Sequence, residues 1–121
     1  MLDSELDKAV ISLAPIGDGR WRASVRFSSG FSGFQGHFPG SPVLPGVMHL
    51  ELARHLAERV NGKPHRIRQV IAAKFTRRVV PGETLEVALS LASFNGELRA
   101  EVETTAEGEP AARFSLSLVT I

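Results

Sequence analysis

The sequence predicts an α+β fold in which one long central helix is wrapped by a curved antiparallel β-sheet of about six strands. Three observations support this prediction. Only residues 46–60 have a convincing helical pattern, whereas six other segments have the pattern of strands, several of them joined by tight-turn signals. The length of 121 residues suits one domain over residues 1–121 and leaves little room for a second.

The predicted helix has clear boundaries and a wide apolar face. Pro45 stands where a proline is tolerated at a helix start, and Asn61-Gly62 ends the helix. The apolar residues cover a broad arc and are Leu50, Leu52, Ala53, Leu56, Ala57 and Val60. Polar and charged residues occupy the opposite side, at Glu51, Arg54, His55 and Glu58. An apolar arc this wide predicts a helix that other structure largely encloses.

The predicted strands lie on both sides of the helix in sequence, two before it and four after it. The first is a short apolar run at 9–14, and the second alternates apolar and polar residues over 21–27. The later strands are expected at 67–80, 85–92, 98–103 and 112–118. Turn signals separate these later strands at Pro81-Gly82, Asn95-Gly96 and residues 108–110, which favours antiparallel hairpins.

Composition excludes several classes of protein. The chain has no cysteine, which excludes a disulfide framework, a thiolate zinc site and a cysteine nucleophile, and which fits a cytoplasmic location. The acidic N-terminus lacks the apolar core of a signal peptide. Residues 27–50 carry no Asp, Glu, Lys or Arg, but five glycines and three prolines argue against a membrane span there. A net charge of +1 without a recognised module argues against nucleic-acid binding.

The segment with the strongest chemical signal is residues 36–47, which contains three prolines and three glycines. Such a segment holds its backbone in a rigid path, so it can fix one side chain, here His37. The path ends at the helix start, where the backbone N–H of Gly46 is a free donor at the positive end of the helix dipole. Glu51 follows five residues later. From these residues alone the segment is a possible acid–base site, although each residue also has an ordinary structural explanation.

The run HFPGSPVLPGVMHLE at residues 37–51 resembles the signature of the 3-hydroxyacyl-[acyl-carrier-protein] dehydratases, the FabZ/FabA family of hotdog-fold proteins. That signature is approximately H-F-P-G-x-P-V/I-x-P-G-V-x-x-x-E, and every fixed position is met. The later run KFTRRVVPGETL, at residues 74–85, resembles a second family segment, F-x-R-P-V-V-P-G-D. The resemblance extends well over about residues 31 to 90, and the C-terminal strands agree in pattern only.

The resemblance implies a hotdog fold, a dimer or an assembly of dimers, and a reaction without a cofactor or a metal ion. The expected reaction converts a 3-hydroxyacyl thioester on acyl carrier protein into a trans-2-enoyl thioester, in fatty acid or specialised lipid and polyene synthesis. By position, His37 and Glu51 match the catalytic base and acid, contributed by different subunits. Gly46 matches the glycine whose N–H binds the thioester carbonyl. Further candidates for substrate binding are Val47, Phe34, Phe38 and His55.

The chain departs from the family pattern at three positions. His55 stands where the family has Gln, and it is expected to hydrogen-bond Glu51 or a water molecule. His49 replaces an aliphatic residue within the apolar arc, where it needs a partner. Arg78 replaces a proline of the second motif. These departures concern substrate choice more than reaction type.

Basic residues are concentrated between Arg59 and Pro81, which contains seven of the fourteen Lys and Arg residues and no acid. They are either solvated strand faces or a docking surface for an acidic carrier protein. The expected docking residues are Arg66, Arg68, Lys74, Arg77 and Arg78.

Three alternatives stay open at the level of sequence. One is another hotdog thioester enzyme, either an enoyl-coenzyme A hydratase or an acyl thioesterase, and another is a member without catalytic activity. A zinc site formed by His49, Glu51 and His55 is disfavoured, because His49 and Glu51 face about 160° apart on a helix. Acyl chain length, isomerase activity, the type of carrier and assembly beyond a dimer are not determined by the sequence.

Overall fold

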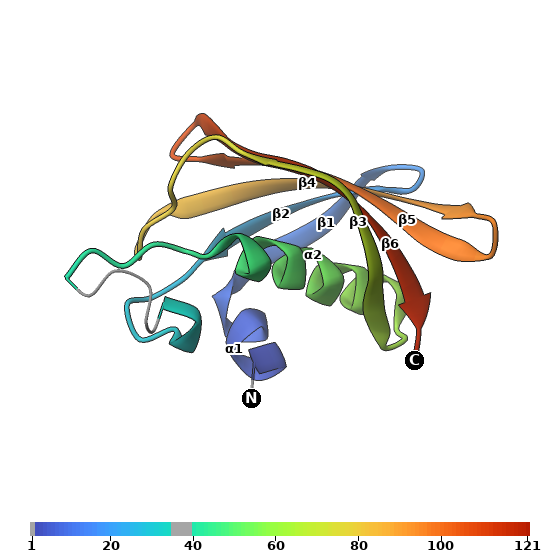
Figure 1. Ribbon diagram of the computed structural model, residues 1–121, viewed down its shortest axis with the longest axis horizontal. Helices are drawn as coiled ribbons and strands as arrows, with labels where there is room; N and C mark the ends of the chain where they lie inside the picture. Colours follow the sequence, from blue (N-terminus) through green and yellow to red (C-terminus); the bar gives the residue numbers. More distant parts are fainter. Residues whose placement is uncertain (1, 35–39) are drawn as a thin grey trace.

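The computed structural model describes residues 2–34 and 40–121 of the chain. Within these residues the fold consists of six strands, two α-helices and one short 3-10 helix (Figure 1). The elements in chain order are α1 (Leu2–Ala9), β1 (Val10–Gly17), β2 (Arg20–Arg26), η1 (Ser32–Phe34), α2 (Gly46–Asn61), β3 (His65–Phe75), β4 (Thr84–Phe94), β5 (Glu97–Ala106) and β6 (Glu109–Thr120). The α+β prediction with about six strands is therefore confirmed. None of the described helices is long and apolar enough to cross a bilayer.

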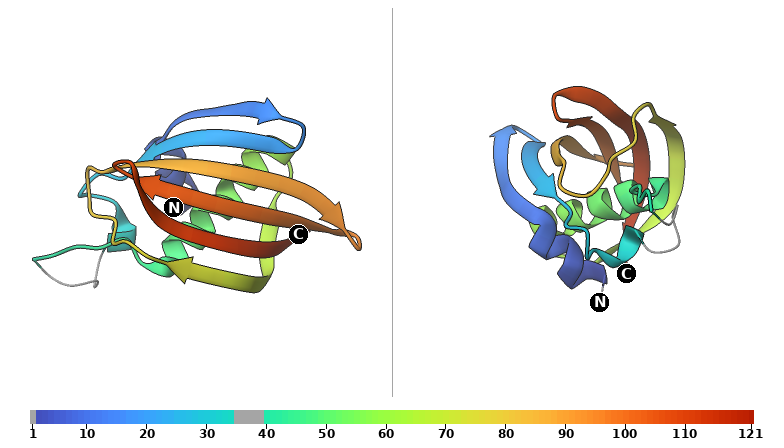
Figure 2. Two further views of the ribbon diagram at one scale, coloured as in Figure 1. Left: turned by 90° about the horizontal axis from the view of Figure 1, so that it is seen from above. Right: turned by 90° about the vertical axis from the view of Figure 1, so that its left-hand side faces the viewer.

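The strands form one antiparallel sheet in the order β1-β2-β4-β5-β6-β3, so β1 and β3 are its edges. Figure 2 shows the sheet curving over α2, which lies across one face. The alternation predicted from sequence is confirmed in β2, β4, β5 and β6, whose apolar residues are buried while most of their polar neighbours are exposed. The core therefore lies between α2 and the inner face of the sheet.

Helix α2 begins and ends as the sequence predicted. Pro45 precedes its first turn in an extended conformation, and Gly62 closes it with a φ of 74°. The Gly62 N–H donates to the carbonyl of Glu58 at 2.7 Å, a C-terminal cap that a left-handed glycine allows. The apolar arc is buried at Leu52, Ala53, Leu56 and Ala57. The polar side of α2 is also covered in part, because α1 packs beside it.

The helix α1 was not predicted from the sequence. Most of its side chains are polar, and its apolar residues Leu2, Leu6 and Ala9 give too short a pattern for a confident assignment. Leu6 is completely buried and anchors the helix to the core. Residues 10–17 then form β1, in partial agreement with the strand expected at 9–14.

Two strand boundaries differ from the prediction. Strand β3 stops at Phe75 instead of continuing to residue 80, because Thr76 and Arg77 both donate to the Ala111 carbonyl and leave the strand register. Strand β6 begins at Glu109, so Pro110 lies inside the strand, although the sequence predicted that it belongs to a turn. The turn itself is formed by Glu107 and Gly108, with φ values of 50° and 84°. Asn95 and Gly96 form the predicted hairpin turn between β4 and β5. Pro81-Gly82 also turns the chain, but it does not form a hairpin, because β3 and β4 are not neighbours in the sheet.

Truncation of Leu6 should show how strongly α1 is attached. We expect Leu6→Ala to lower the free energy of unfolding by about 2–3 kcal/mol, because it leaves a cavity beneath α1. The matched control is Ile11→Ala, a similar truncation at a side chain that is 59% exposed, which should change stability by under about 0.5 kcal/mol. Urea denaturation measures both values, and equal losses would contradict a buried anchor.

Candidate active site

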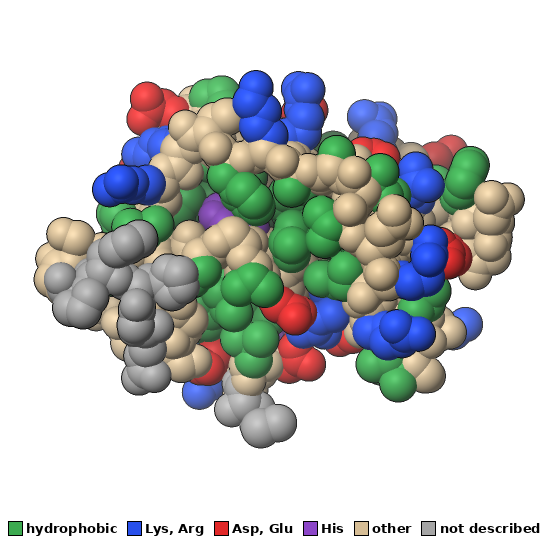
Figure 3. Space-filling view, viewed as in Figure 1, with side chains coloured by type: hydrophobic (Ala, Val, Ile, Leu, Met, Phe, Trp, Pro, Cys, Tyr) green, Lys and Arg blue, Asp and Glu red, His purple; other side chains and the backbone are tan. Residues whose placement is uncertain are grey.

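The start of α2 faces a cavity of about 360 Å³. This cavity is open to solvent and is bordered by the loop before α2, the first turn of α2 and the residues at the end of β3. Its lining residues are Val43, Leu44, Gly46, His49, Phe75, Thr76, Arg77 and Arg78. The Leu44 N–H donates to the Val79 carbonyl at 2.8 Å, which joins the loop before α2 to the segment after β3. Figure 3 shows this face of the molecule, with a histidine visible in a hollow between hydrophobic side chains.

Gly46 brings the helix N-terminus against the wall of this cavity. A Cβ atom at position 46 would lie 3.2 Å from the Phe75 ring, closer than ordinary contact, so a larger residue would displace Phe75. Pro45 provides no side-chain cap for the first N–H groups of α2. The positive dipole end of α2 therefore lies beside this cavity, and its first N–H groups have no side-chain cap from Pro45. The role of Gly46 in binding a carbonyl oxygen stays a prediction.

His49 lies one turn after Gly46 and faces the same cavity. The side chain is only 4% exposed, and its ring centroid is 5.2 Å from that of Phe75. Burial lowers the pKa of His49 from its ordinary value of 6.5 to about 4, since the charged form loses its hydration. Its Nδ1 atom is buried and has no hydrogen-bond partner among the described residues. The partner that the sequence led us to expect for His49 is therefore not found within residues 2–34 and 40–121.

Glu51 lies on the other side of α2 and is held by an arginine. Its Oε2 atom accepts a hydrogen bond from Nε of Arg54 at 2.5 Å, and its side chain is 28% exposed. Arg54 also donates to Glu58 at 2.9 Å and to Asp3 of α1 at 2.6 Å. Partial burial disfavours the charged guanidinium, but the bonds to Asp3 and Glu51 outweigh burial and raise the pKa of Arg54 above its usual value. Arg54 therefore stays charged and links three carboxylates.

His55 contacts a residue that the sequence did not suggest. Its Nε2 atom lies 3.1 Å from Oδ1 of Asp7 in α1, so it contacts α1 and not Glu51. Its Nδ1 atom is buried without a hydrogen bond among the described residues. His55 is absent from the lining of the cavity at the start of α2. A role for His55 in substrate binding consequently stays a prediction with no geometric support in the described part of the chain.

The remaining predicted site residues have various environments. His37 and Phe38 lie outside the described residues. Phe34 is buried in a cluster with Phe27 and Phe31, whose ring centroids lie 6.5 and 5.7 Å from its own, and this is core packing. Val47 is exposed at the start of α2.

The predicted docking residues do not form a single patch. Arg66 and Lys74 are eight residues apart on β3, which corresponds to about 26 Å along an extended strand. Arg68 pairs with Glu97. Arg77 is held by Glu83 at 2.7 Å and Glu109 at 3.0 Å; these two bonds raise the pKa of Arg77 above its usual range.

Arg77 therefore fixes the segment after β3 and is unavailable to a partner. Arg78 lies on the cavity, is exposed and has no carboxylate partner among the described residues. Of the five predicted docking residues, Arg78 is the one that combines an unpaired charge with a position on the cavity.

Two other features fit a functional site less well. Asp3, His55 and Glu58 have possible metal ligand atoms within 4.8 Å of one another, but Arg54 already bonds Asp3 and Glu58 and neutralises them. His49 and His55 face different neighbours, Phe75 and Asp7, so they do not form the zinc site considered above.

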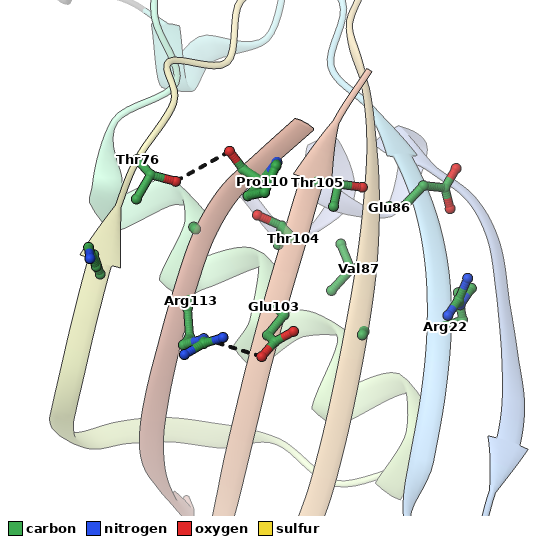
Figure 4. A pocket seen from close by; sticks show the side chains of 12 residues that line it. Arg22, Thr76, Glu86, Val87, Glu103, Thr104, Thr105, Pro110 and Arg113 are labelled. Carbon is green, nitrogen blue, oxygen red and sulfur yellow. Dashed lines mark hydrogen bonds and ion pairs between the residues drawn. The ribbon is translucent and has the colours of Figure 1, made fainter. Parts of the chain in front are cut away.

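The outer face of the sheet has a hollow of about 520 Å³ (Figure 4). Charged side chains of both signs line it. Arg113 pairs with Glu103 at 3.2 Å, and Thr76 donates to the Pro110 carbonyl at 3.2 Å. Charges of both signs on an exposed sheet face are expected of a solvated surface. No described residue of the motif at 37–51 lines this hollow, although Lys74 and Thr76 of the second motif do.

A curved antiparallel sheet wrapped around one long helix, with the helix N-terminus facing a cavity, defines a hotdog-fold protein. The family model for ApeI-like proteins, described as ApeI dehydratase, matches residues 15–114. The chain belongs to the ApeI-like dehydratase family.

Curated relatives agree with this assignment. The chain is 36% identical over 96 residues to the 3-hydroxyacyl-[acyl-carrier-protein] dehydratase FabZ of Acetivibrio thermocellus, covering 73% of this chain and 66% of that protein. It is 39% identical over 95 residues to the same enzyme from Thermus thermophilus, covering 71% and 67%. The chain thus spans about two thirds of the length of the curated relatives it matches.

Solved structures share the fold at low sequence identity. The dehydratase heterocomplex ApeI:P from Xenorhabdus doucetiae gives a TM-score of 0.78 at 20% identity, covering 90% of this chain and 95% of that one. A hypothetical thioesterase with coenzyme A from Streptococcus pneumoniae gives 0.67 at 11% identity, covering 98% and 94%. At these identities the structural likeness supports the fold and not a particular reaction.

The buried His49 should make the protein sensitive to acid. Because its pKa is lowered on folding, its contribution to stability is fully present above pH 6.5 and is lost as the pH falls toward 4. That loss amounts to ~3 kcal/mol for a shift of this size. We expect His49→Leu to be more stable than the wild type at pH 4.5 by much more than at pH 7, as measured by urea denaturation. A difference independent of pH would contradict the assignment of a neutral buried imidazole.

Proposed function

We propose that the protein dehydrates 3-hydroxyacyl thioesters carried by acyl carrier protein, giving trans-2-enoyl thioesters and water. The observation that carries this proposal is the family match over residues 15–114, which includes the whole His37–Glu51 motif. The relatives at 36–39% identity are named as enzymes of this reaction. Membership in a dehydratase family, together with an uncapped helix N-terminus on a cavity, supports the same chemistry.

The reaction removes a proton from the carbon next to the thioester carbonyl and breaks the bond from carbon 3 to its hydroxyl group. His37 would accept that proton, since an imidazole with a pKa near neutrality is suited to general-base catalysis. Negative charge grows on the carbonyl oxygen, where the Gly46 N–H would stabilise it. Glu51 would donate a proton to the departing hydroxyl group, and the electron pair forms the new double bond between carbons 2 and 3.

The geometry around Glu51 adds one requirement to this mechanism. Glu51 must exchange its bond with Arg54 for one with the substrate or its leaving group. Arg54 would keep Asp3 and Glu58 as partners when this happens, so its charge would not be left uncompensated. The cost of freeing Glu51 is therefore smaller than the cost of breaking an isolated buried ion pair.

A second chain would complete the site. Glu51 and the cavity lie on different sides of α2, which supports a site in which His37 and Glu51 come from different subunits. The edge strand β3 exposes Val70, Ile71 and Phe75, and Figure 3 shows hydrophobic side chains gathered over α2 and beside β3. An uncovered apolar edge strand is suited to pairing with another chain. That chain is a second copy or, as in the heterocomplex ApeI:P, a different partner.

The thioesterase and coenzyme A hydratase alternatives have weaker support. The thioesterase structure resembles this chain at 11% identity, which is a likeness of fold alone. Water addition to an enoyl thioester is the reverse of the proposed reaction, so a hydratase assay is also the most direct test.

Reversible hydration of a crotonyl thioester should distinguish the catalytic residues from their neighbours. We expect wild-type activity to fall by roughly 10²–10⁴-fold in His37→Ala and in Glu51→Gln, because each variant loses a proton-transfer group. Glu58→Gln is the matched control, since Glu58 binds Arg54 from the same helix but lies outside the motif. An equal loss in Glu58→Gln would assign the effect to the Arg54 cluster and not to the chemistry of Glu51.

Reversal of the charge at Arg78 should weaken the binding of the carrier-protein substrate and leave the small thioester substrate unaffected. We expect Arg78→Glu to raise KM for an acyl-carrier-protein thioester about 5-fold, a typical effect for a rim charge facing an acidic partner. Crotonyl N-acetylcysteamine should be hydrated at the wild-type rate. Arg99→Glu, at the far hairpin, is the control for net charge. A similar loss with both substrates would count against docking at Arg78.

A further inference from the structure

The buried imidazole of His49 has no role in the mechanism given so far. Its side chain is only 4% exposed, and its Nδ1 atom lacks a hydrogen-bond partner among the described residues. A buried polar group without a hydrogen-bond partner destabilises a folded protein. An apolar side chain at position 49 would avoid this cost, so the imidazole needs an explanation beyond packing.

The position of His49 points to the thioester-binding end of the cavity. His49 follows Gly46 by three residues, so both lie on one face of α2, and both line the cavity. Side chains on an α-helix lean toward its N-terminus, which brings the imidazole beside the uncapped first turn. The Phe75 ring, 5.2 Å away between centroids, packs against the imidazole and limits its movement.

The charge state of His49 suits a hydrogen-bond donor. With a pKa lowered to about 4 by burial, the ring is neutral near pH 7 and carries one N–H group and one lone pair. A neutral imidazole can donate to an oxygen on which negative charge is developing without itself giving up a proton.

We propose that His49 donates a hydrogen bond to the thioester carbonyl oxygen, next to the N–H of Gly46. The two donors together would stabilise the enolate-like charge that forms when the neighbouring carbon loses its proton. His49 is then a further catalytic residue of this chain, and a bound thioester gives its buried ring the partner that the protein alone does not. This inference rests on the proposed dehydratase function.

The kinetic test compares His49→Leu with His49→Gln in the hydration of crotonyl N-acetylcysteamine. We expect His49→Leu to lower kcat about 10²-fold with little change in KM, because a donor that acts mainly in the transition state is lost. Gln retains an N–H donor on a side chain of similar reach, so His49→Gln should recover part of kcat. Met48→Leu, at the neighbouring position that does not line the cavity, should keep the wild-type rate.

A vibrational measurement distinguishes hydrogen-bond donation by His49 from a role of its side chain in packing alone. The Raman carbonyl frequency of bound crotonyl thioester should be lower on the wild type than in water, and His49→Leu should move it back toward the free value. The inference is overturned if His49→Leu keeps kcat within 3-fold, or if Leu and Gln variants lose activity equally while the carbonyl frequency is unchanged. A wild type without hydration activity would instead refute the proposed function, and this inference with it.

Discussion

The contact between Gly46 and Phe75 is the constraint on which the site depends. A glycine at the first position of α2 allows the helix to begin against an aromatic ring, at a distance where a Cβ atom would push the ring aside. The hydrogen bond from Leu44 to Val79 holds the loop on the other side. Together these contacts leave a small cavity whose wall contains the free donors of a helix N-terminus. The curvature of the sheet matters because it brings the end of β3 to this point.

The polar side of α2 is organised by one guanidinium group. Arg54 joins Glu51 and Glu58 on its own helix to Asp3 on α1, and its side chain is 12% exposed. Charged hydrogen bonds in a partly buried setting are stronger than those on an open surface, so this cluster contributes to the attachment of α1. The same cluster holds the carboxylate proposed to act as the acid. Attachment of α1 and orientation of Glu51 are thus linked through a shared arginine.

The sequence predicted the parts of the fold whose pattern is local. Alternating residues in β2, β4, β5 and β6, the Asn95-Gly96 turn and the limits of α2 are all set by neighbours in the chain, and they agree with the structure. The motif also led to Gly46, which does lie on a cavity. The helix α1 could not be predicted with the same ease, because its eight residues contain a single fully buried side chain, Leu6.

The side-chain partners were the least predictable feature. The bond of Glu51 to Arg54 has a spacing of three residues that a helix allows, but the partner Asp3 lies 51 residues away in sequence. His55 was expected to hydrogen-bond Glu51 or a water molecule, and the packing of α1 places Asp7 beside it. Arg77 was expected to be free to bind a carrier protein, but it forms ion pairs with two glutamates, Glu83 and Glu109. Such pairings depend on which elements pack against each other, and this cannot be inferred from the local pattern of a single sequence.

The location of α1 has a practical consequence for handling this protein. Helix α1 begins at Leu2, one residue before the carboxylate that binds the Arg54 guanidinium, so an affinity tag fused directly ahead of this helix would emerge beside that charged cluster. A polyhistidine sequence there would bring extra imidazoles within reach of Asp3 and Asp7. At the opposite terminus, Ile121 is 80% exposed and follows the last residue of β6. Purification handles are better attached at that end, where they leave the arginine cluster undisturbed.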